Sequence, residues 1–295
     1  MKDFVILGDS TCDLDPTTRQ EFDIDYIPMG YTVDDKDYAA SLEWEAHSVK
    51  EFYDLVRGGK RVFTSQINTN VCREKFLSAI EAGKEVLYIS CSSALSSSYQ
   101  SACVIAKEIE DANPGAKIYC VDALISCLGQ GHLLLEASRQ RKAGKSAQQT
   151  AAYIESIRLK VNMIGYPGSL EYLRRAGRVK ASSAFFGNLF GVKPIIISDR
   201  KGNNYALKKV KGIANARNAV AELVAEALTE ETDTLYIVHA DCPEEAEALK
   251  NVILSCRTFK EVRTGNIGPI VGASVGPGMV GAFIYGKEVT IEGND

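Results

Sequence analysis

The segment 86–106, VLYISCSSALSSSYQSACVIA, decides how the first half of this chain folds. The apolar run 86–89 is typical of a buried parallel strand, and the run 103–106 is typical of a helix. The serine-rich turn between them, residues 92–102, contains no Lys, Arg or His. Such a turn gathers free backbone N–H groups, hydroxyls and the positive end of a helix dipole. It therefore suits a carboxylate or a phosphate, although serine is also a common helix N-cap without any ligand.

The composition excludes several classes of protein. The 295 residues suffice for two domains, and with 45% apolar and 24% charged residues the chain resembles a soluble globular protein. The formal net charge of -4 argues against nucleic acid or an anionic membrane as the main partner. No stretch approaches the roughly 20 apolar residues of a membrane span. We expect a cytoplasmic protein without stable membrane insertion.

The cysteines and histidines give no sign of a metal site. None of the eight cysteines belongs to a CxxC pair, and most lie in apolar runs. They are therefore expected to be reduced, mostly buried thiols. The three histidines, His47, His132 and His239, are scattered without the spacing of metal ligands. We predict neither a metal nor a cofactor.

The order of strand-like and helix-like runs predicts an α/β fold. The two types alternate through the first half, which favours a mostly parallel sheet covered by helices on both faces. The second half contains the pattern of a hairpin with its turn at 201–204, so a second α/β domain with a mixed sheet is expected. We divide the chain into domains 1–155 and 156–295. A helix over 147–161 and a short strand at 270–271 are also predicted.

Three hydroxyl-bearing turns follow strand-like runs. DSTCD at 9–13 follows the first strand, TSQ at 64–66 follows a predicted strand at 61–63, and the serine turn at 92–98 follows the strand at 86–89. Ligands of open parallel sheets bind outside the carboxyl ends of the strands. We therefore expect the three turns to converge on one site.

Two glycine motifs do not support an enzyme. GASVG at 272–276 fits the nucleophile elbow of α/β-hydrolases, but these enzymes need a histidine after the serine, and the last histidine is His239. GPGMVG at 276–281 fits a dinucleotide fingerprint, yet only 14 residues follow it, too few for the rest of that unit. These glycines more simply allow a close approach of the backbone to a ligand or to another element.

An enzyme remains the alternative function. Asp9 and Asp13 resemble the aspartates of phosphatases with an aspartyl nucleophile, but their spacing is four rather than two, and an Asx turn or a helix cap explains them. The alternative is an enzyme acting on a small phosphorylated or acyl substrate through Asp9 and the oxyanion turns. Because no phosphate-binding lysine motif or catalytic histidine can be assembled, we predict no catalytic residues.

Short motifs along nearly the whole chain resemble those of the DegV family of bacterial fatty-acid-binding proteins. They are DSTCDL (9–14), TSQ (64–66), LSSSYQSA (95–102), SLEYLRRAGR (169–178), VKP (192–194), and IGP through GPG (267–278). Each motif is short, but their joint order is specific. The resemblance implies a two-domain DegV-like fold whose domain 156–295 closes a lipid tunnel.

The resemblance also implies a function. One long-chain fatty acid would bind between the two domains, as a ligand rather than a cofactor. The protein would present its carboxylate to an ATP-dependent fatty acid kinase, which forms the acyl-phosphate. Nothing in the sequence demands more than a monomer. An apolar acid other than a straight-chain fatty acid is a further possibility, because the sequence does not fix chain length or unsaturation.

The resemblance carries over to particular residues. Thr64 and Ser96 would hydrogen-bond the carboxylate, with the backbone N–H of Ser97 beside them. The supporting residues of the site are Asp9, Ser65, Arg174 (or its neighbour Arg175), Ser274 and Gly278. Ser274 stands where the family commonly has a histidine, which could partly neutralise the carboxylate. A serine can still donate one hydrogen bond.

Overall fold

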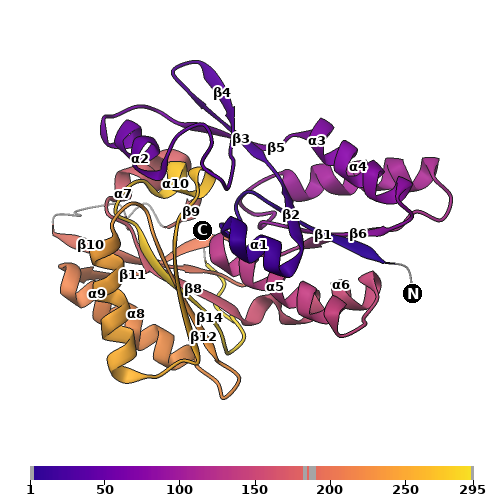
Figure 1. Ribbon diagram of the computed structural model, residues 1–295. Coiled ribbons are helices and arrows are strands. Elements are labelled where there is room, and N and C mark those ends of the chain that lie inside the picture. The colour runs from indigo at the N-terminus through magenta and orange to yellow at the C-terminus, as the bar shows by residue number, and fades with distance from the viewer. Residues whose placement is uncertain (1–2, 182–184, 186–190, 294–295) are drawn as a thin grey trace. The chain divides into compact units, whose positions relative to one another are not determined.

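The chain forms two compact units, drawn together in Figure 1. The computed structural model describes residues 3–181, 185 and 191–293. The first unit consists of Met1–Ala46 and Phe63–Arg158, and the second of His47–Val62 and Leu159–Asp295. The segment His47–Val62 therefore belongs to the second unit although it comes from the first half of the sequence.

The first unit contains a parallel sheet and a small antiparallel sheet. Its strands are β1 (Phe4–Asp9), β2 (Ile24–Ile27), β3 (Met29–Val33), β4 (Lys36–Ala39), β5 (Phe63–Ile67), β6 (Glu85–Ser90) and β7 (Ile118–Asp122). Its helices are α1 (Pro16–Phe22), α3 (Thr69–Glu81), α4 (Ser98–Ala112), α5 (Cys127–Lys142) and α6 (Ala147–Ile157). The parallel sheet has the order β2-β1-β6-β7, and the antiparallel sheet has the order β4-β3-β5.

Helices cover both faces of the parallel sheet, as the alternating pattern predicted. Figure 1 shows α3 and α4 together on one face and α5 and α6 on the other. The central strands are almost entirely buried, which is why they read as continuous apolar runs: Val86, Leu87 and Ile89 of β6 are each fully inaccessible. The α/β fold with a parallel sheet in the N-terminal part is confirmed.

The second unit is built on a mixed sheet of the order β13-β12-β14-β8-β10-β11-β9. Its strands are β8 (Val161–Tyr166), β9 (Val179–Lys180), β10 (Val192–Ser198), β11 (Asn204–Lys211), β12 (Thr234–His239), β13 (Glu261–Asn266) and β14 (Val280–Tyr285). Its helices are α2 (Val49–Arg57), α7 (Leu170–Ala176), α8 (Ile213–Ala227), α9 (Pro243–Cys256) and α10 (Pro269–Val275), and a short 3-10 helix, η1 (Arg158–Lys160), precedes β8. The strand pairs β12–β13 and β11–β9 are parallel and the others are antiparallel, so the predicted mixed sheet is confirmed.

Two side chains of α2 attach this helix to the rest of the second unit. The Tyr53 hydroxyl donates to the carbonyl of Ile267 at 2.7 Å. One turn further on, Arg57 forms an ion pair with Asp241 at 2.6 Å. Phe52 and Tyr53 are fully buried, so helix α2 contributes its apolar face to the unit.

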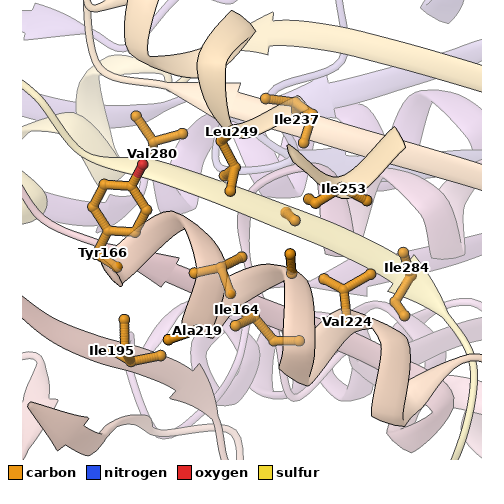
Figure 2. Packing of buried hydrophobic residues seen from close by; sticks show 14 of the residues in the cluster. Ile164, Tyr166, Ile195, Ala219, Val224, Ile237, Leu249, Ile253, Val280 and Ile284 are labelled. Carbon is orange, nitrogen blue, oxygen red and sulfur yellow. The ribbon is translucent and has the colours of Figure 1, made fainter. Parts of the chain in front are cut away.

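The core of the second unit lies between the mixed sheet and helices α8 and α9. Figure 2 shows side chains from these elements pointing toward one another; they include Ile164, Ile237 and Ile284 of the strands and Val224, Leu249 and Ile253 of the helices. Each buried aliphatic side chain of this size contributes about 1.5–3 kcal/mol of transfer free energy. Ala216 and Ala219 are also buried, because small side chains let α8 approach the sheet closely.

Two of the predicted elements were wrong. The helix predicted over 147–161 ends at Ile157, and Val161 begins β8, a central strand of the mixed sheet. Val161 and Met163, which are two residues apart and both buried, show the period-two signal of that strand. The strand predicted at 270–271 is part of helix α10, where Pro269 occupies the first helical position, a common place for proline.

The predicted turn at 64–66 is also wrong, because these residues lie inside β5. This strand pairs antiparallel with β3 and does not belong to the parallel sheet. Of the three predicted turns, therefore, those after β1 and β6 lie at the carboxyl ends of parallel strands, and the segment 64–66 does not. Strand β5, which carries Thr64, instead lies next to the serine turn through hydrogen bonds to the start of α4.

Candidate functional site

The serine turn is organised by its own hydroxyl groups. Ser96 Oγ accepts a hydrogen bond from the Ser98 N–H at 3.2 Å, at the start of α4. It also lies 2.9 Å from Ser98 Oγ. Ser92 Oγ accepts from the Ala94 N–H at 3.2 Å. Such side-chain to backbone bonds replace the missing helical partners at a helix N-terminus, so the turn has a defined shape.

Strand β5 lies beside this turn. The Ile67 N–H donates to Ser98 Oγ at 3.1 Å, and Ser101 Oγ donates to Gln66 Oε1 at 3.0 Å. In the pairing with β3, Ile67 is opposite Met29 and Ser65 is opposite Gly30, so Gln66 forms a bulge. A bulge re-aims a side chain, and here it directs Gln66 toward α4. The structure thus brings the strand of Thr64 and the turn of Ser96 together in the first unit.

Ser65 packs against Gly30 of the neighbouring strand β3. Ser65 is exposed, and its Oγ atom lies over Gly30. A Cβ atom at Gly30 would be 2.5 Å from that oxygen, so only glycine fits there without a shift of Ser65. Thr64 is half-buried and pairs with Tyr31.

Two donors of this region are available to a ligand. The Ser97 N–H at the first turn of α4 and the Thr64 hydroxyl donate no hydrogen bond within residues 3–181, 185 and 191–293. The segments 64–66 and 92–102 carry no Lys, Arg or His. An anion here would be held by neutral donors and by the dipole of α4.

The Asp9 carboxylate connects the ends of the parallel strands β1 and β6, next to the serine turn. It is fully buried, and its carboxylate accepts from the Cys91 N–H at 2.8 Å and the Thr11 N–H at 3.0 Å. The Tyr88 hydroxyl donates to it at 3.3 Å. Burial, and next the Asp9 charge, raise the pKa of Tyr88, which therefore remains a donor. A carboxylate with these buried partners positions the turn, and this does not favour the alternative of Asp9 as a nucleophile.

The remaining predicted residues belong to the second unit. Arg174 is exposed in the last turn of α7, and Ser274 is half-buried in α10. Gly278 has a φ of +83°, which favours glycine. A Cβ atom at Gly276 would lie 2.2 Å from the Tyr172 ring, so this glycine allows a close approach of another element, as one of the two sequence interpretations proposed.

Arg174 also lines a cavity of about 670 Å³ within the second unit. Glu171 and Lys193 line the same cavity. Lys193 Nζ donates to the carbonyl of Gly168 at 2.7 Å, and burial lowers the pKa of its ammonium group. Two cationic side chains and one carboxylate make this cavity suited to a polar group rather than to a hydrocarbon tail.

Three side chains of the site lie within the predicted segments 64–66 and 92–102 but were not singled out from the sequence. They are Gln66, Ser98 and Ser101, which connect β5 to α4. The spacing of Ser96 and Ser98 was a signal for Ser98, because a hydroxyl often accepts from the N–H two residues further on. For Gln66 no local signal exists, since its role depends on the bulge.

Within the described residues, no cluster of three or more His, Cys, Asp or Glu side chains could hold a metal ion. None of the helices in the described ranges has the length and apolar character needed to cross a bilayer.

Comparisons with known proteins place the chain in a family. A family model described as "Uncharacterised protein, DegV family" matches residues 3–287. A DegV domain-containing protein of Clostridium perfringens is 31% identical over 287 residues, covering 97% of this chain and 98% of that protein. The structure matches a DegV lipid binding protein from Thermotoga maritima with a TM-score of 0.85 and 26% identity, covering 98% of this chain and 100% of the other. It also matches a fatty-acid-binding DegV family protein from Thermus thermophilus with a TM-score of 0.86 and 26% identity, covering 97% and 100%. The chain therefore belongs to the DegV family.

Proposed function

We propose that this protein binds one long-chain fatty acid and presents its carboxylate to an ATP-dependent fatty acid kinase. The observation that carries the proposal is the hydrogen bond from the Ile67 N–H to Ser98 Oγ, because it places a threonine-bearing strand against a serine-rich helix N-terminus. The Thermus thermophilus relative, described as fatty-acid-binding, supports the ligand class. We further propose that the protein acts in the cytoplasm as a monomer.

The hydrogen bonds of the serine turn have a direction that favours an anion. Ser98 Oγ accepts a hydrogen bond from the Ile67 N–H and can donate one to Ser96 Oγ. Ser96 Oγ also accepts from the Ser98 N–H. The proton of Ser96 is then left to donate to a carboxylate oxygen. Chains of hydrogen bonds polarise one another, so this donor is stronger than an isolated hydroxyl. The Thr64 hydroxyl and the Ser97 N–H would complete the contact.

Affinity and orientation have different sources in this proposal. Burying about 14 methylene groups at roughly 0.8 kcal/mol each contributes on the order of 11 kcal/mol, from which the loss of chain and rotational freedom subtracts several. Hydrogen bonds to a charged group such as the carboxylate add about 1.5–3 kcal/mol each. The tail therefore makes the largest single contribution to affinity, whereas Thr64, Ser96 and Ser97 orient the group that is to be phosphorylated.

The supporting residues have proposed roles that follow from their chemistry. Asp9 positions the serine turn, and Ser65 fixes the packing of β5 on Gly30. We assign to Arg174 an electrostatic attraction for the carboxylate of the fatty acid. Ser274 would donate one hydrogen bond to this carboxylate, where a histidine would partly neutralise it. Gly278 supplies a backbone conformation that other residues rarely adopt.

The first experiment identifies the ligand. An organic extract of the purified protein is analysed by mass spectrometry, and a stoichiometric C14–C18 fatty acid is the expected result. A stoichiometric acid of another kind would keep the carboxylate site but change the ligand class. A protein that is empty and also takes up no added fatty acid would overturn the proposal.

The second experiment separates orientation from affinity. The double variant Ser96→Ala/Thr64→Ala loses two bonds to the charged carboxylate and should bind fatty acid at least about 100-fold more weakly, while the tail contacts are unaffected. Acyl-phosphate formation by a cognate kinase should remain reduced even with saturating fatty acid, where weaker binding no longer contributes. Ser93→Ala is the matched control in the same turn, since the backbone N–H that contacts Asp122 is retained. Unchanged phosphorylation in the double variant would refute the orienting role.

A further inference from the structure

The segment that follows β7, residues 122–126, is attached to the serine turn by backbone hydrogen bonds. The Ala123 N–H donates to the carbonyl of Ser90 at 3.0 Å, which continues the pairing of β7 with β6 past the last residue of each strand. In the opposite direction, the Ser92 N–H donates to the carbonyl of Ile125 at 3.0 Å. The connections that follow these two neighbouring strands are therefore joined at the carboxyl edge of the parallel sheet.

The Asp122 side chain adds a further connection. Asp122 is 8% exposed, and its Oδ1 atom accepts from the Ser93 N–H at 3.1 Å and from the Leu124 N–H at 3.0 Å. The guanidinium of Arg158 donates to the Asp122 carbonyl at 2.7 Å, so the backbone of this residue is anchored as well. A single carboxylate oxygen thus holds the serine turn and its own loop in one arrangement.

Leu124 has a left-handed backbone conformation. Its φ is +54°, a value that residues with a bulky side chain rarely adopt. The bond from the Leu124 N–H to the side chain of Asp122, two residues earlier, closes an Asx turn. Unfavourable backbone conformations persist where the surrounding contacts determine them, and they are frequent at functional sites. Asp122, rather than the local preference of the chain, therefore holds this loop in its shape.

Ser93 lies inside the turn that carries one of the hydroxyls proposed to bind the fatty acid. The N–H groups of Leu95 and Ser96 both donate to the carbonyl of Ser92, at 3.0 and 3.1 Å, so the turn is compact and bonded internally. A displacement at Ser93 is consequently passed on to the Ser96 hydroxyl. The bond from the Ser93 N–H to Asp122 is the side-chain contact that prevents such a displacement.

We propose that Asp122 is a positioning residue for the fatty-acid carboxylate: it fixes the Ser93 N–H and thereby the direction of the Ser96 hydroxyl. This role rests on the proposed function, because it concerns the same carboxylate contact. Asp122 does not bind the headgroup itself, since two carboxylates repel each other. The turn needs one acceptor oxygen from this side chain. Asp122 Oδ2 makes no hydrogen bond among residues 3–181, 185 and 191–293, so an amide group in its place would break none.

Three variants separate the acceptor from the charge. Asp122→Ala removes both, whereas Asp122→Asn keeps an oxygen that can accept from the N–H groups of Ser93 and Leu124. Asp15→Ala is the matched control, because Asp15 also accepts from a backbone N–H in the first unit, that of Thr18 in α1. The control variant loses a comparable bond without changing the contacts of the serine turn.

The measurement follows the carboxyl carbon of the ligand. Each full-length protein is loaded with palmitic acid labelled with 13C at this carbon, and the NMR resonance of the bound acid is recorded at neutral pH. Its position depends on the hydrogen bonds that the carboxylate accepts. Wild type, Asp122→Asn and Asp15→Ala should share one resonance. Asp122→Ala should bind the acid at most about 10-fold more weakly, because the donors themselves remain, but with a displaced resonance.

The outcomes distinguish this role from the proposed function. An unmoved resonance in Asp122→Ala would overturn the positioning role and leave the proposed function intact. An equal displacement in Asp122→Asn would show that the charge acts rather than the hydrogen bonds, and would also overturn it. A wild-type protein without a resonance of bound acid would overturn both. Asp122→Glu moves the acceptor by one methylene group, should also displace the resonance, and replaces Asp122→Ala if that variant does not fold.

Discussion

Asp9 is a buried carboxylate whose contacts all come from donors. Hydroxyl and N–H groups of Thr11, Tyr88 and Cys91 surround it, and they join the end of β1 to the end of β6. Thr11 Oγ1 also lies 2.7 Å from Gln130 Oε1, so helix α5 is connected to the same network. Buried polar networks of this kind are costly to interrupt, because each donor left without a partner keeps its full desolvation penalty.

Replacing this carboxylate tests the network. Asp9→Asn puts an NH2 group where an acceptor is needed, and we expect the free energy of unfolding to fall by about 1–3 kcal/mol. Urea denaturation measures the change. Asp35→Asn is the control, since Asp35 is exposed with a φ of +59°, a conformation that asparagine tolerates. An equal effect of the two substitutions would show that Asp9 is not a structural centre.

Gly272 allows a close contact between α10 and α2. A Cβ atom at this position would be 2.5 Å from the Tyr53 hydroxyl, which donates to the carbonyl of Ile267. We therefore expect Gly272→Ala to lower the free energy of unfolding by about 1–3 kcal/mol. The double variant Gly272→Ala/Tyr53→Phe lacks the hydroxyl that clashes. Its loss in free energy of unfolding should therefore be smaller than the sum of the losses in the two single variants. Simple additivity in urea denaturation would contradict the proposed clash.

At the scale of elements, helix α6 begins with a reciprocal cap. Ser146 Oγ accepts from the Gln149 N–H at 3.2 Å, and Gln149 Oε1 accepts from the Ser146 N–H at 3.0 Å. These two bonds satisfy donors that have no partner within the helix. The cap is encoded locally, and it explains why the start of this helix was correctly predicted while its end was not.

The cap makes a testable contribution to stability. Ser146→Ala should lower the free energy of unfolding by about 1 kcal/mol because the N-terminal donors lose their acceptor. Ser156→Ala is the matched control on the same helix, where the exposed hydroxyl only donates back to the carbonyl of Tyr153. Thermal or urea unfolding of both variants should show a clear difference. Equal stabilities would mean that the cap contributes nothing measurable.

Element types were easier to predict from the sequence than element partners. Val86–Ile89 was identified as a strand because its apolar run is followed by a serine-rich turn. This run does not say which strands it pairs with. β5 shows the consequence: its residues were expected to follow a parallel strand, but the strand pairs antiparallel with β3 in a separate sheet. Pairing depends on residues far away in sequence, which local patterns do not contain.

At the scale of the whole molecule, buried histidine links stability to pH. His132 is only 7% exposed, and its burial, together with the charge of Arg139, lowers its pKa to about 4. In the unfolded chain the pKa of histidine is about 6.5. Between these values the unfolded state binds more protons than the folded state, so the stability contributed by the neutral imidazole is lost as pH falls from about 6.5 toward 4.

The pH dependence can be measured directly. We expect the free energy of unfolding to be about 2 kcal/mol lower at pH 5 than at pH 7 through this group alone. His132→Gln removes the titrating group, so the difference between the two pH values should shrink by that amount in urea denaturation. The carboxylates and His239 act equally in both proteins and are therefore controlled. An unchanged pH dependence in the variant would contradict the assignment to His132.

The sequence by itself determined the fold class, the family resemblance and the identity of the hydroxyl-rich segments. It did so because apolar periodicity, capping residues and short motifs are local properties, which neighbouring residues encode. Thr64, Ser96 and Ser97 were selected in this way, and their role as ligand-binding residues is a proposal. Only the tertiary structure could decide which segments meet. The bond from Ile67 to Ser98 joins residues 31 positions apart, and the bond from Tyr53 to Ile267, which attaches helix α2 to the second unit, joins residues 214 positions apart. Such contacts form because burying apolar surface and satisfying buried donors are properties of the packed chain, not of any one segment.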